Sequence, residues 1–552
     1  MGSGLLSIAE VAGVRPFAFA DSVGEDAAMT RPGRISRRKF LGAAAGASAA
    51  ASSLSCGPHG LFGIFRSFRP TILGGVGSGD VTHDAAIVRS AANRPGRMTV
   101  EWATVESLKD ATQVVGPDAV SRTGFTAQVD LTGLPADTRV FYRVRFESLD
   151  DFSMSEPVTG SFRTAPAPGT PPARDVTIVW SGDTAGQGWG IDPARGGMPI
   201  YAAMTALDPD LFIHSGDTIY ADVPIPETVA LPDGSAWKNI VMPAKSKPAQ
   251  SLAEFRANHA YNLLADGVRT FNARVPIIAQ WDDHEVRNNW FPGQRIDDPR
   301  YDERDADVLA ARARQAFMEY MPIRPGATDP GRIYRNYAYG PLVEVFVVDE
   351  RSYRGPNSPN RQTSLGRAAE FLGPPQLEWL KRALAASTAT WKVIASDMPM
   401  SCVAKDGKTD YEAWANGEPG APLGRELELA NLLSFIKQTR VRNVVFVTAD
   451  VHFAANLHYH PDRATAFKAF DPFWEFISGP LHAGGFGPSQ LDKTFGPEYR
   501  WKSTPAKQGI GPGHGYGHFG MIRVDATSRV MSVTQHDIAG REIARQEIEP
   551  VA

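Results

Sequence analysis

The sequence predicts an α/β protein, in which a layered sheet-and-helix domain follows a small all-β domain of the immunoglobulin or fibronectin type. Two observations support this prediction. Between about residues 75 and 164, short alternating segments are separated by turn residues, which is typical of a small β-sandwich. From residue 175 to about residue 460, short apolar runs alternate with segments of helical periodicity, which is typical of strands buried between helices.

Length and composition limit the classes of protein. The 552 residues exceed one ordinary domain, and 43% hydrophobic residues suffice for more than one core. A net charge of -4 argues against a chain-wide surface for nucleic acid. The chain has only two cysteines, Cys56 and Cys402, which excludes a disulfide framework and a cysteine-rich zinc site.

Residues 1–56 are expected to be an export leader. Arg37 and Arg38 precede a weakly hydrophobic, alanine-rich run, an order that resembles a twin-arginine signal. We therefore expect the twin-arginine export machinery as a partner and a periplasmic or extracellular location. Met29 is an alternative start, and a disordered basic terminus is the alternative interpretation. Cys56 resembles a lipoprotein cleavage site, which would tether the protein to a membrane.

The remaining chain is divided into a β-sandwich over residues 72–165, a Pro-rich linker over residues 166–174 and a larger domain over residues 175–552. Helical periodicity in the larger domain predicts helices over residues 309–320, 375–386 and 427–439. Two strands after residue 518 are expected to complete its sheet. The apolar runs that predict its other strands are 176–180, 211–214, 275–279, 342–348, 392–395 and 444–447.

Five of these strands end in residues that bind cations or phosphate. Such ends are expected to converge along one edge of a sheet, which is how a two-metal hydrolase is assembled. Each aspartate alone is equally explained by a helix cap or a turn. The five strand ends carry Asp183, Asp217 with Tyr220, Asp283 with His284, Asp397, and Asp450 with His452.

The order of these motifs resembles the calcineurin-like metallophosphoesterase superfamily. Trp281-Asp-Asp-His-Glu285 and Tyr220 after Gly216-Asp217 are similar to the PhoD-type alkaline phosphatases within it. The segment Asp349-Glu-Arg351-Ser-Tyr353-Arg354 is also similar to that family, and the resemblance covers about residues 75 to 548. It implies a metallophosphoesterase domain that hydrolyses phosphate esters.

The resemblance also implies metal ligands. A first metal, Fe3+, would be held by four side chains, and a second metal would share Asp217 and add three carboxylates. The PhoD type commonly has a cysteine where Asp183 stands, so Mn2+ is an alternative at the first site. The oxygen-rich second site favours Ca2+, with Mn2+ or Mg2+ as alternatives. The ligands are Asp183, Asp217, Tyr220 and His452 at the first site and Asp283, Asp397 and Asp450 at the second.

The expected mechanism is attack by a metal-activated hydroxide on a small phosphate ester. His284 would stabilise the phosphate oxygens or protonate the leaving group, with support of Asp283 as its alternative role. Arg351 is the first choice for a catalytic phosphate contact. The candidate substrate-binding residues are Arg287, Asn289, Arg354 and His482.

We therefore expect an exported alkaline phosphatase or phosphodiesterase that scavenges phosphate. One alternative is a phospholipase D or C acting on lipid head groups, for which aromatic side chains would line a lipid-binding mouth. Another is a non-catalytic extracytoplasmic protein that binds phosphate or metal. The aromatic residues considered for the mouth are Trp189, Trp290, Phe291, Phe473 and Trp474.

Overall fold

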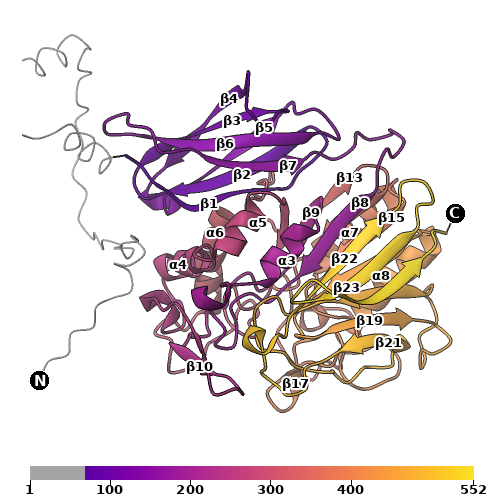
Figure 1. Ribbon diagram of the computed structural model, residues 1–552. Coiled ribbons are helices and arrows are strands. Elements are labelled where there is room, and N and C mark those ends of the chain that lie inside the picture. The colour runs from indigo at the N-terminus through magenta and orange to yellow at the C-terminus, as the bar shows by residue number, and fades with distance from the viewer. Residues whose placement is uncertain (1–68, 552) are drawn as a thin grey trace, which may run out of the picture. The chain divides into compact units, whose positions relative to one another are not determined.

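The computed structural model describes residues 69–551 (Figure 1). The predicted leader over residues 1–56, including Met29 and Cys56, lies outside the described residues. Residues 70–552 form one compact unit. Among the described residues, none of the helices has the length and apolar character needed to cross a membrane.

Two mixed sheets form the body of the protein. One has nine strands in the order β24-β23-β22-β8-β9-β12-β1-β2-β5, and the other has seven in the order β13-β14-β15-β18-β20-β19-β21. In the first sheet, the strands from the larger domain are β8 (Val176–Ser181), β9 (Leu211–Ser215), β12 (Ile277–Gln280), β22 (His518–Val524), β23 (Met531–Asp537) and β24 (Glu542–Ile548). The second sheet comprises β13 (Arg335–Tyr339), β14 (Val343–Val347), β15 (Trp391–Ala395), β18 (Val444–Thr448), β19 (Ala454–Tyr459), β20 (Phe473–Ile477) and β21 (Pro497–Ser503).

The two sheets pack face to face, and helices cover both outer faces. Ile178 and Ile213 on the first sheet belong to the same buried cluster as Val345 on the second. Alternate residues such as Val179 and Phe212 face the helices instead. The helices on the first sheet are α3 (Ile200–Ala206), α4 (Leu252–Asn262), α5 (Asp266–Asn272) and α6 (Ala306–Tyr320). Those on the second are α7 (Pro374–Ala386) and α8 (Glu426–Thr439).

The predicted all-β region is present before the helices. Its four-stranded sheet has the order β4-β3-β6-β7, and it packs against β1, β2 and β5 through residues such as Met98 and Val144. Buried and partly exposed residues alternate along β6, as expected for a half-buried strand. The strands are β1 (Ile72–Gly79), β2 (Ala85–Ala92), β3 (Gly96–Ala103), β4 (Thr112–Ala119), β5 (Thr126–Thr132), β6 (Arg139–Ser148) and β7 (Val158–Arg163).

One feature of this region differs from a separate sandwich. Strands β1, β2 and β5 continue the nine-stranded sheet, because β1 pairs in parallel with β12 at Gly79 and Ile277. A Cβ atom at Gly79 would lie 2.5 Å from the carbonyl oxygens of Ile277 and Pro322, so only glycine permits this approach. In Figure 1 the indigo strands accordingly lie beside α5 and α6.

The predicted layered architecture is confirmed, and each of the six apolar runs overlaps one of the strands β8, β9, β12, β14, β15 and β18. The five motif-bearing ends, however, come from two facing sheets rather than from one sheet edge. Strands β8, β9 and β12 belong to the first sheet, whereas β15 and β18 belong to the second. The functional residues therefore gather where the carboxyl ends of both sheets meet. The remaining short strands are β10 (Thr228–Ala230), β11 (Ala236–Lys238), β16 (Lys405–Asp406) and β17 (Asp410–Tyr411).

Candidate metal centre

The strand ends place their polar side chains through unusual backbone conformations. Asp183, Asp217, Asp450 and His452 have φ angles of 68, 49, 57 and 59°, in the left-handed region that non-glycine residues rarely adopt. The side chains of Asp183, Asp217 and His452 are buried, and that of Asp450 is 13% exposed. Such conformations carry an energetic cost and occur mainly at functional sites. The tight turns after β8, β9 and β18 thus direct carboxylate and imidazole groups into one place.

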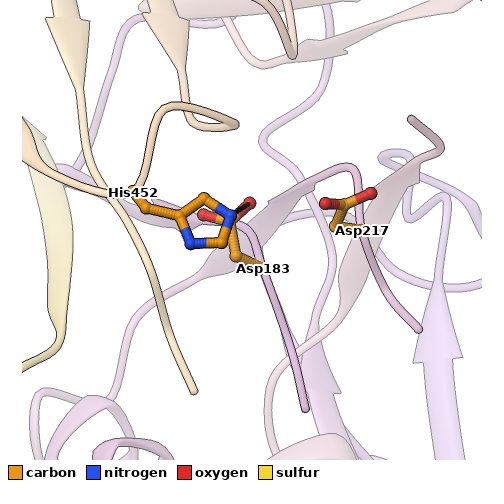
Figure 2. A group of neighbouring side chains, drawn as sticks. All are labelled: Asp183, Asp217 and His452. Atoms are coloured by element: carbon orange, nitrogen blue, oxygen red, sulfur yellow. Dashed lines mark ion pairs between the residues drawn. The ribbon is translucent and has the colours of Figure 1, made fainter. Parts of the chain in front are cut away.

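The first group of side chains consists of Asp183, Asp217, Tyr220 and His452. Asp183, Asp217 and His452 offer ligand atoms that all lie within 4.8 Å of one another, and Figure 2 shows these three side chains. The hydroxyl oxygen of Tyr220 lies 2.8 Å from Nε2 of His452. Both carboxylate oxygens of Asp183 are buried and have no hydrogen-bond partner among the described residues. Unpartnered buried acceptors of this kind fit a bound cation.

His452 presents the nitrogen that a metal requires. Its Nδ1 lies 2.5 Å from the carbonyl oxygen of Gly484 and donates its proton there, which leaves Nε2 free of a proton. Burial lowers the pKa of His452 to about 4, so the ring is neutral at pH 7. The Nε2 lone pair therefore faces Asp183, whose Oδ1 lies 3.5 Å away.

The carboxylates of this group lack enough positive charge around them. Burial, together with neighbouring carboxylates, raises the pKa of Asp183 and of Asp217 well above the ordinary value. Burial and the same two aspartates also raise the pKa of the Tyr220 phenol. A bound cation would relieve both effects, because it favours the ionised forms. The donor set of two carboxylates, one phenol and one imidazole therefore fits a cation of high charge.

Asp217 also belongs to a second group, with Asp283 and His284. The backbone N–H of His284 donates to Oδ1 of Asp217 at 3.1 Å, and the backbone N–H of Asn289 donates to Oδ2 of Asp283 at 2.5 Å. These bonds fix the two carboxylates toward each other, while Oδ1 of Asp283 has no partner among the described residues. One carboxylate is thus shared by two groups that could each hold a metal ion.

The ring of His284 is held by a residue that the sequence analysis did not identify. Its Nδ1 donates to Oδ1 of Asp222 at 2.6 Å, and its ring packs at a tilt against Tyr220 with centroids 4.2 Å apart. Burial lowers the pKa of His284, but the carboxylates of Asp222 and Asp283 outweigh burial and raise it to about 10. A protonated imidazole cannot bind a metal, so His284 lies beside the second group, with Nε2 on the side of Asp283, and the donors of that group are the carboxylates of Asp217 and Asp283.

Arg351 is the positive centre of the remaining carboxylates. Its buried guanidinium donates to Asp282 and, at 3.1 Å, to Glu412. Although burial raises the pKa of Asp282, the adjacent Arg351 lowers it below the ordinary value. Three further carboxylates, those of Asp283, Asp397 and Asp450, each lie 3.9 Å from the guanidinium. The carboxylates of Asp397 and Asp450 thus face Arg351, and both oxygens of Asp397 lack a hydrogen-bond partner among the described residues.

The four candidate substrate-binding residues differ in their placement. Asn289 adjoins Asp283, and its side chain donates to Asp406 at 3.1 Å. Among the described residues no ion pair joins Arg287 or Arg354 to the two metal-binding groups. Arg287 donates to Gln294, whereas Arg354 donates to Asn357. Finally, Nε2 of His482 donates to the carbonyl of Gly190 at 2.7 Å, so its ring is engaged away from Asp183 although its backbone N–H bonds the Asp183 carbonyl.

Three residues of this region were missed by sequence reasoning. Asp222 lies two positions after Tyr220, and Asp282 directly precedes Asp283. Their closeness to these motif residues in the sequence could have identified both. Glu412 lies in a loop without any motif, and only the folded chain shows that it accepts from Arg351. Glu350 has a supporting role, because it accepts from Ser396 and from the backbone N–H of Met398 on either side of Asp397.

Two facing sheets with aspartate, histidine and tyrosine side chains gathered at their strand ends define a hydrolase of the metallophosphoesterase fold. Residues 178–535 match the family described as PhoD-like phosphatase, and residues 62–166 match the N-terminal domain of PhoD-like phosphatases. The chain belongs to the PhoD-like phosphatase family and is a phosphoesterase, a hydrolase of phosphate ester bonds.

Individual relatives agree with this family. Alkaline phosphatase D of Bacillus subtilis (strain 168) is 26% identical over 485 residues, which are 82% of this chain and 75% of the relative. A solved structure of PhoD matches with a TM-score of 0.64 and 21% identity, over 86% of this chain and 88% of that one. A solved structure of purple acid phosphatase PPD1 from yellow lupin (Lupinus luteus) seeds matches with a TM-score of 0.53 and 12% identity, over 87% of this chain and 74% of that one. The two structures support the fold.

Proposed function

We propose that this phosphoesterase is an exported alkaline phosphatase or phosphodiesterase that releases phosphate from small esters for scavenging. One observation carries the proposal. Asp217 belongs both to the group with Asp183 and His452 and to the group with Asp283 and His284. A carboxylate shared by two cation-binding groups is the arrangement that a two-metal hydrolase needs. The Bacillus relative named alkaline phosphatase D supports the substrate class.

The first group is proposed to hold Fe3+, with Mn2+ as the alternative, because a phenol with a raised pKa needs a strongly acidic cation to ionise. The second group, with oxygen donors from Asp217 and Asp283, suits Ca2+, Mn2+ or Mg2+. Asp397 and Asp450 complete the carboxylate set beside Arg351. When bound, such cations supply the Lewis acidity that neutralises phosphate oxygens and activates water.

The residues of the chain have distinct proposed roles. His284, protonated and fixed by Asp222, stabilises the phosphate oxygens or gives its Nε2 proton to the leaving alkoxide. Arg351, expected from the sequence to contact the phosphate, is fully buried among carboxylates, so its proposed role is to hold those of Asp283, Asp397 and Asp450 in place. Asn289, next to Asp283, is the proposed substrate contact best supported by its position.

The domain organisation is part of the proposal. We divide the chain into a leader over residues 1–56, a sandwich over residues 72–165, a linker over residues 166–174 and the phosphatase domain over residues 175–552. The match of residues 62–166 to the N-terminal domain of this family supports a boundary between that domain and the phosphatase domain near residue 166. Export rests on the paired arginines Arg37 and Arg38 of the leader.

The test is release of p-nitrophenol from the mono-ester and the bis-ester at alkaline pH. Turnover is measured before and after chelation, with Fe3+, Mn2+ and Ca2+ returned singly and in pairs. We expect activity only with two cations present, and Asp217→Asn should abolish it while the far-UV circular dichroism stays unchanged. An active Asp217→Asn enzyme would overturn the shared-carboxylate assignment. The ratio of the two ester rates distinguishes a phosphatase from a phosphodiesterase.

A phospholipase gains no support from three of the five aromatic residues considered for it. Trp189 and Trp290 are buried, and Trp290 packs against Trp281 with ring centroids 5.7 Å apart. Phe473 is also buried and stacks on Tyr459 in β19 and β20. These three side chains do not line a lipid-binding mouth, because their apolar surface is already covered by protein. Phe291 and Trp474 are partly exposed.

A further inference from the structure

A cavity lies on the side of β9 and β12 that faces the helices, between the N-terminal strands and α4, α5 and α6. Its volume is about 60 Å3. A single water needs at least about 10 to 15 Å3 of such space, so the cavity can hold several waters or one small polyatomic ion. The residues that argue for a ligand are Arg89, His259 and Tyr320, and those that connect the cavity to the candidate metal centre are His214 and Thr218.

Arg89 brings a buried positive charge to this cavity without a counterion. Only 4% of the residue is exposed, and its Nη2 atom has no hydrogen-bond partner among the described residues. Its guanidinium lies 4.4 Å from the ring centroid of Tyr320, and its Nε donates only to the carbonyl of Glu319, at 3.4 Å. The Glu319 carboxylate is already paired with Arg256 at 2.6 Å. An unpaired buried guanidinium is costly, so this position calls for an anion.

His259 adds hydrogen-bonding capacity beside this charge. It is 3% exposed, and neither ring nitrogen has a partner among the described residues. Its ring stacks on Tyr320 with centroids 5.3 Å apart, so Arg89 and His259 contact the same phenol ring. A neutral imidazole offers one N–H donor and one acceptor.

We propose that this cavity binds a small oxyanion, represented by inorganic phosphate, through Arg89 and His259. Water alone can satisfy the hydrogen bonds of these groups, but it leaves the guanidinium charge uncompensated. A cation is excluded by the same charge. A tetrahedral oxyanion supplies both the negative charge and several acceptors for the unpartnered N–H donors. No carboxylate among the described residues is within ion-pair distance of Arg89 to compete for it.

The proposed anion site lies behind the turns that carry Asp183 and Asp217, so its expected role is structural rather than catalytic. Thr218, in the wall, directly follows Asp217, and Nε2 of His214 lies 3.1 Å from the hydroxyl oxygen of Thr184, which follows Asp183. Arg89 lies on β2, whereas His259 lies on α4. A bound anion therefore joins the N-terminal strands to the helices that back the metal-binding turns. The inference goes beyond the proposed function and does not rest on it.

The experiment counts bound phosphate by equilibrium dialysis of the complete, metal-loaded protein with radiolabelled inorganic phosphate. We expect wild-type protein to bind one equivalent more than Arg89→Gln, which keeps a polar side chain but removes the charge. His259→Phe, which keeps an aromatic ring on Tyr320, should lose the same equivalent. Arg97→Gln is the matched control, because Arg97 is an exposed arginine of the same region, paired with Asp118 at 2.8 Å. It should bind as the wild type does.

The outcomes separate this site from the metal centre. Turnover of p-nitrophenyl phosphate should be unchanged in Arg89→Gln, since Arg89 contacts none of the strand-end residues. Phosphate should also raise the melting temperature of Arg97→Gln more than that of Arg89→Gln. Equal phosphate equivalents in wild type, Arg89→Gln and His259→Phe would overturn the anion site. If Arg89→Gln does not fold, the count for His259→Phe decides alone. An inactive wild-type enzyme would contradict the proposed function without changing the difference in bound phosphate.

Discussion

The hydroxyl oxygen of Tyr220 lies 2.8 Å from Nε2 of His452, although the two residues are 232 positions apart in the chain. Tyr220 follows a strand of the first sheet, and His452 follows a strand of the second. A Cβ atom at Gly186 would lie 2.6 Å from the Tyr220 ring, so the glycine leaves the space that the phenol occupies. The first candidate metal-binding group is therefore a contact between sheets, and it forms only when both sheets are packed.

Tyr220→Phe is expected to lose the metal of the first group. Its kcat should fall by at least about 100-fold, which is the usual effect of removing one group that acts on the transition state. The phenol oxygen is the group removed, while the ring keeps its packing against His284. Elemental analysis of the purified protein measures the metal. Tyr334→Phe is the control, because Tyr334 is a buried tyrosine that directly precedes β13 and packs against Trp379 of α7. Full iron or manganese content in Tyr220→Phe would refute the ligand assignment.

Asp222→Asn should lower kcat by about 10- to 100-fold with little change in KM, since the carboxylate acts through His284 and not on the substrate. An amide keeps the size of the side chain but removes the charge that raises the pKa of His284. The dependence of kcat on pH is the measurement that distinguishes this role, because it would not change if Asp222 only stabilised the fold. With the imidazolium less stabilised, the alkaline limb of kcat should shift to lower pH. Asp298→Asn, at an exposed pair with Arg300, should leave the profile unchanged.

Arg351→Gln should destabilise the protein by about 3 to 5 kcal/mol, the cost of breaking a buried ion pair by removing one partner. Asp282 and Glu412 lose their donor, and three more carboxylates lose a positive charge 3.9 Å away. Because a cation can replace that charge, added Ca2+ should recover part of the loss. Urea unfolding with and without Ca2+ measures both effects. Arg361→Gln, at an exposed pair with Glu418, is the control for removing an arginine.

The sequence was sufficient for the architecture because the strands of the body are buried on both faces. Runs such as 176–180 and 444–447 then consist almost wholly of apolar residues, and the aspartates that follow them stand out. The pairing of β1 with β12 could not be read in this way, because it depends on one close approach at Gly79. That pairing joins the predicted sandwich to the main sheet.

Residues of the candidate site could be predicted where they belong to a sequence motif at a strand end. They could not be predicted where tertiary contacts determine which way the side chain points. Asp183, Asp217, Tyr220 and His452 converge as the resemblance implied. His482 lies in an equally suggestive glycine-rich loop, yet its ring turns to Gly190 and packs near Trp237, at 5.6 Å. The cluster around Arg351 likewise depends on loops that no local pattern brings together.

Glu426 provides a pH test that is independent of the metal centre. This residue begins α8, is 1% exposed and accepts hydrogen bonds from the backbone N–H of Leu423 and from Asn416, each at 3.1 Å. Burial and the neighbouring Asp492 raise its pKa to about 9. The folded protein therefore holds a proton on Glu426 that the unfolded chain releases near its usual pKa of about 4.3.

The sign of the effect follows from this difference in bound protons. Between about pH 4.3 and pH 9 the folded state binds more protons than the unfolded state, so the free energy of unfolding falls as the pH rises through this range. Glu426→Gln stays neutral at every pH, and its amide oxygen still accepts from Leu423. We expect it to be nearly equal to the wild type in stability at pH 4.5 and more stable by several kcal/mol at pH 9, since each unit of pKa difference corresponds to about 1.4 kcal/mol. Urea midpoints at the two pH values measure this, with Glu418→Gln, an exposed glutamate, as the control. A wild-type excess of stability that grows with pH would show that Glu426 is ionised and stabilised in the folded protein.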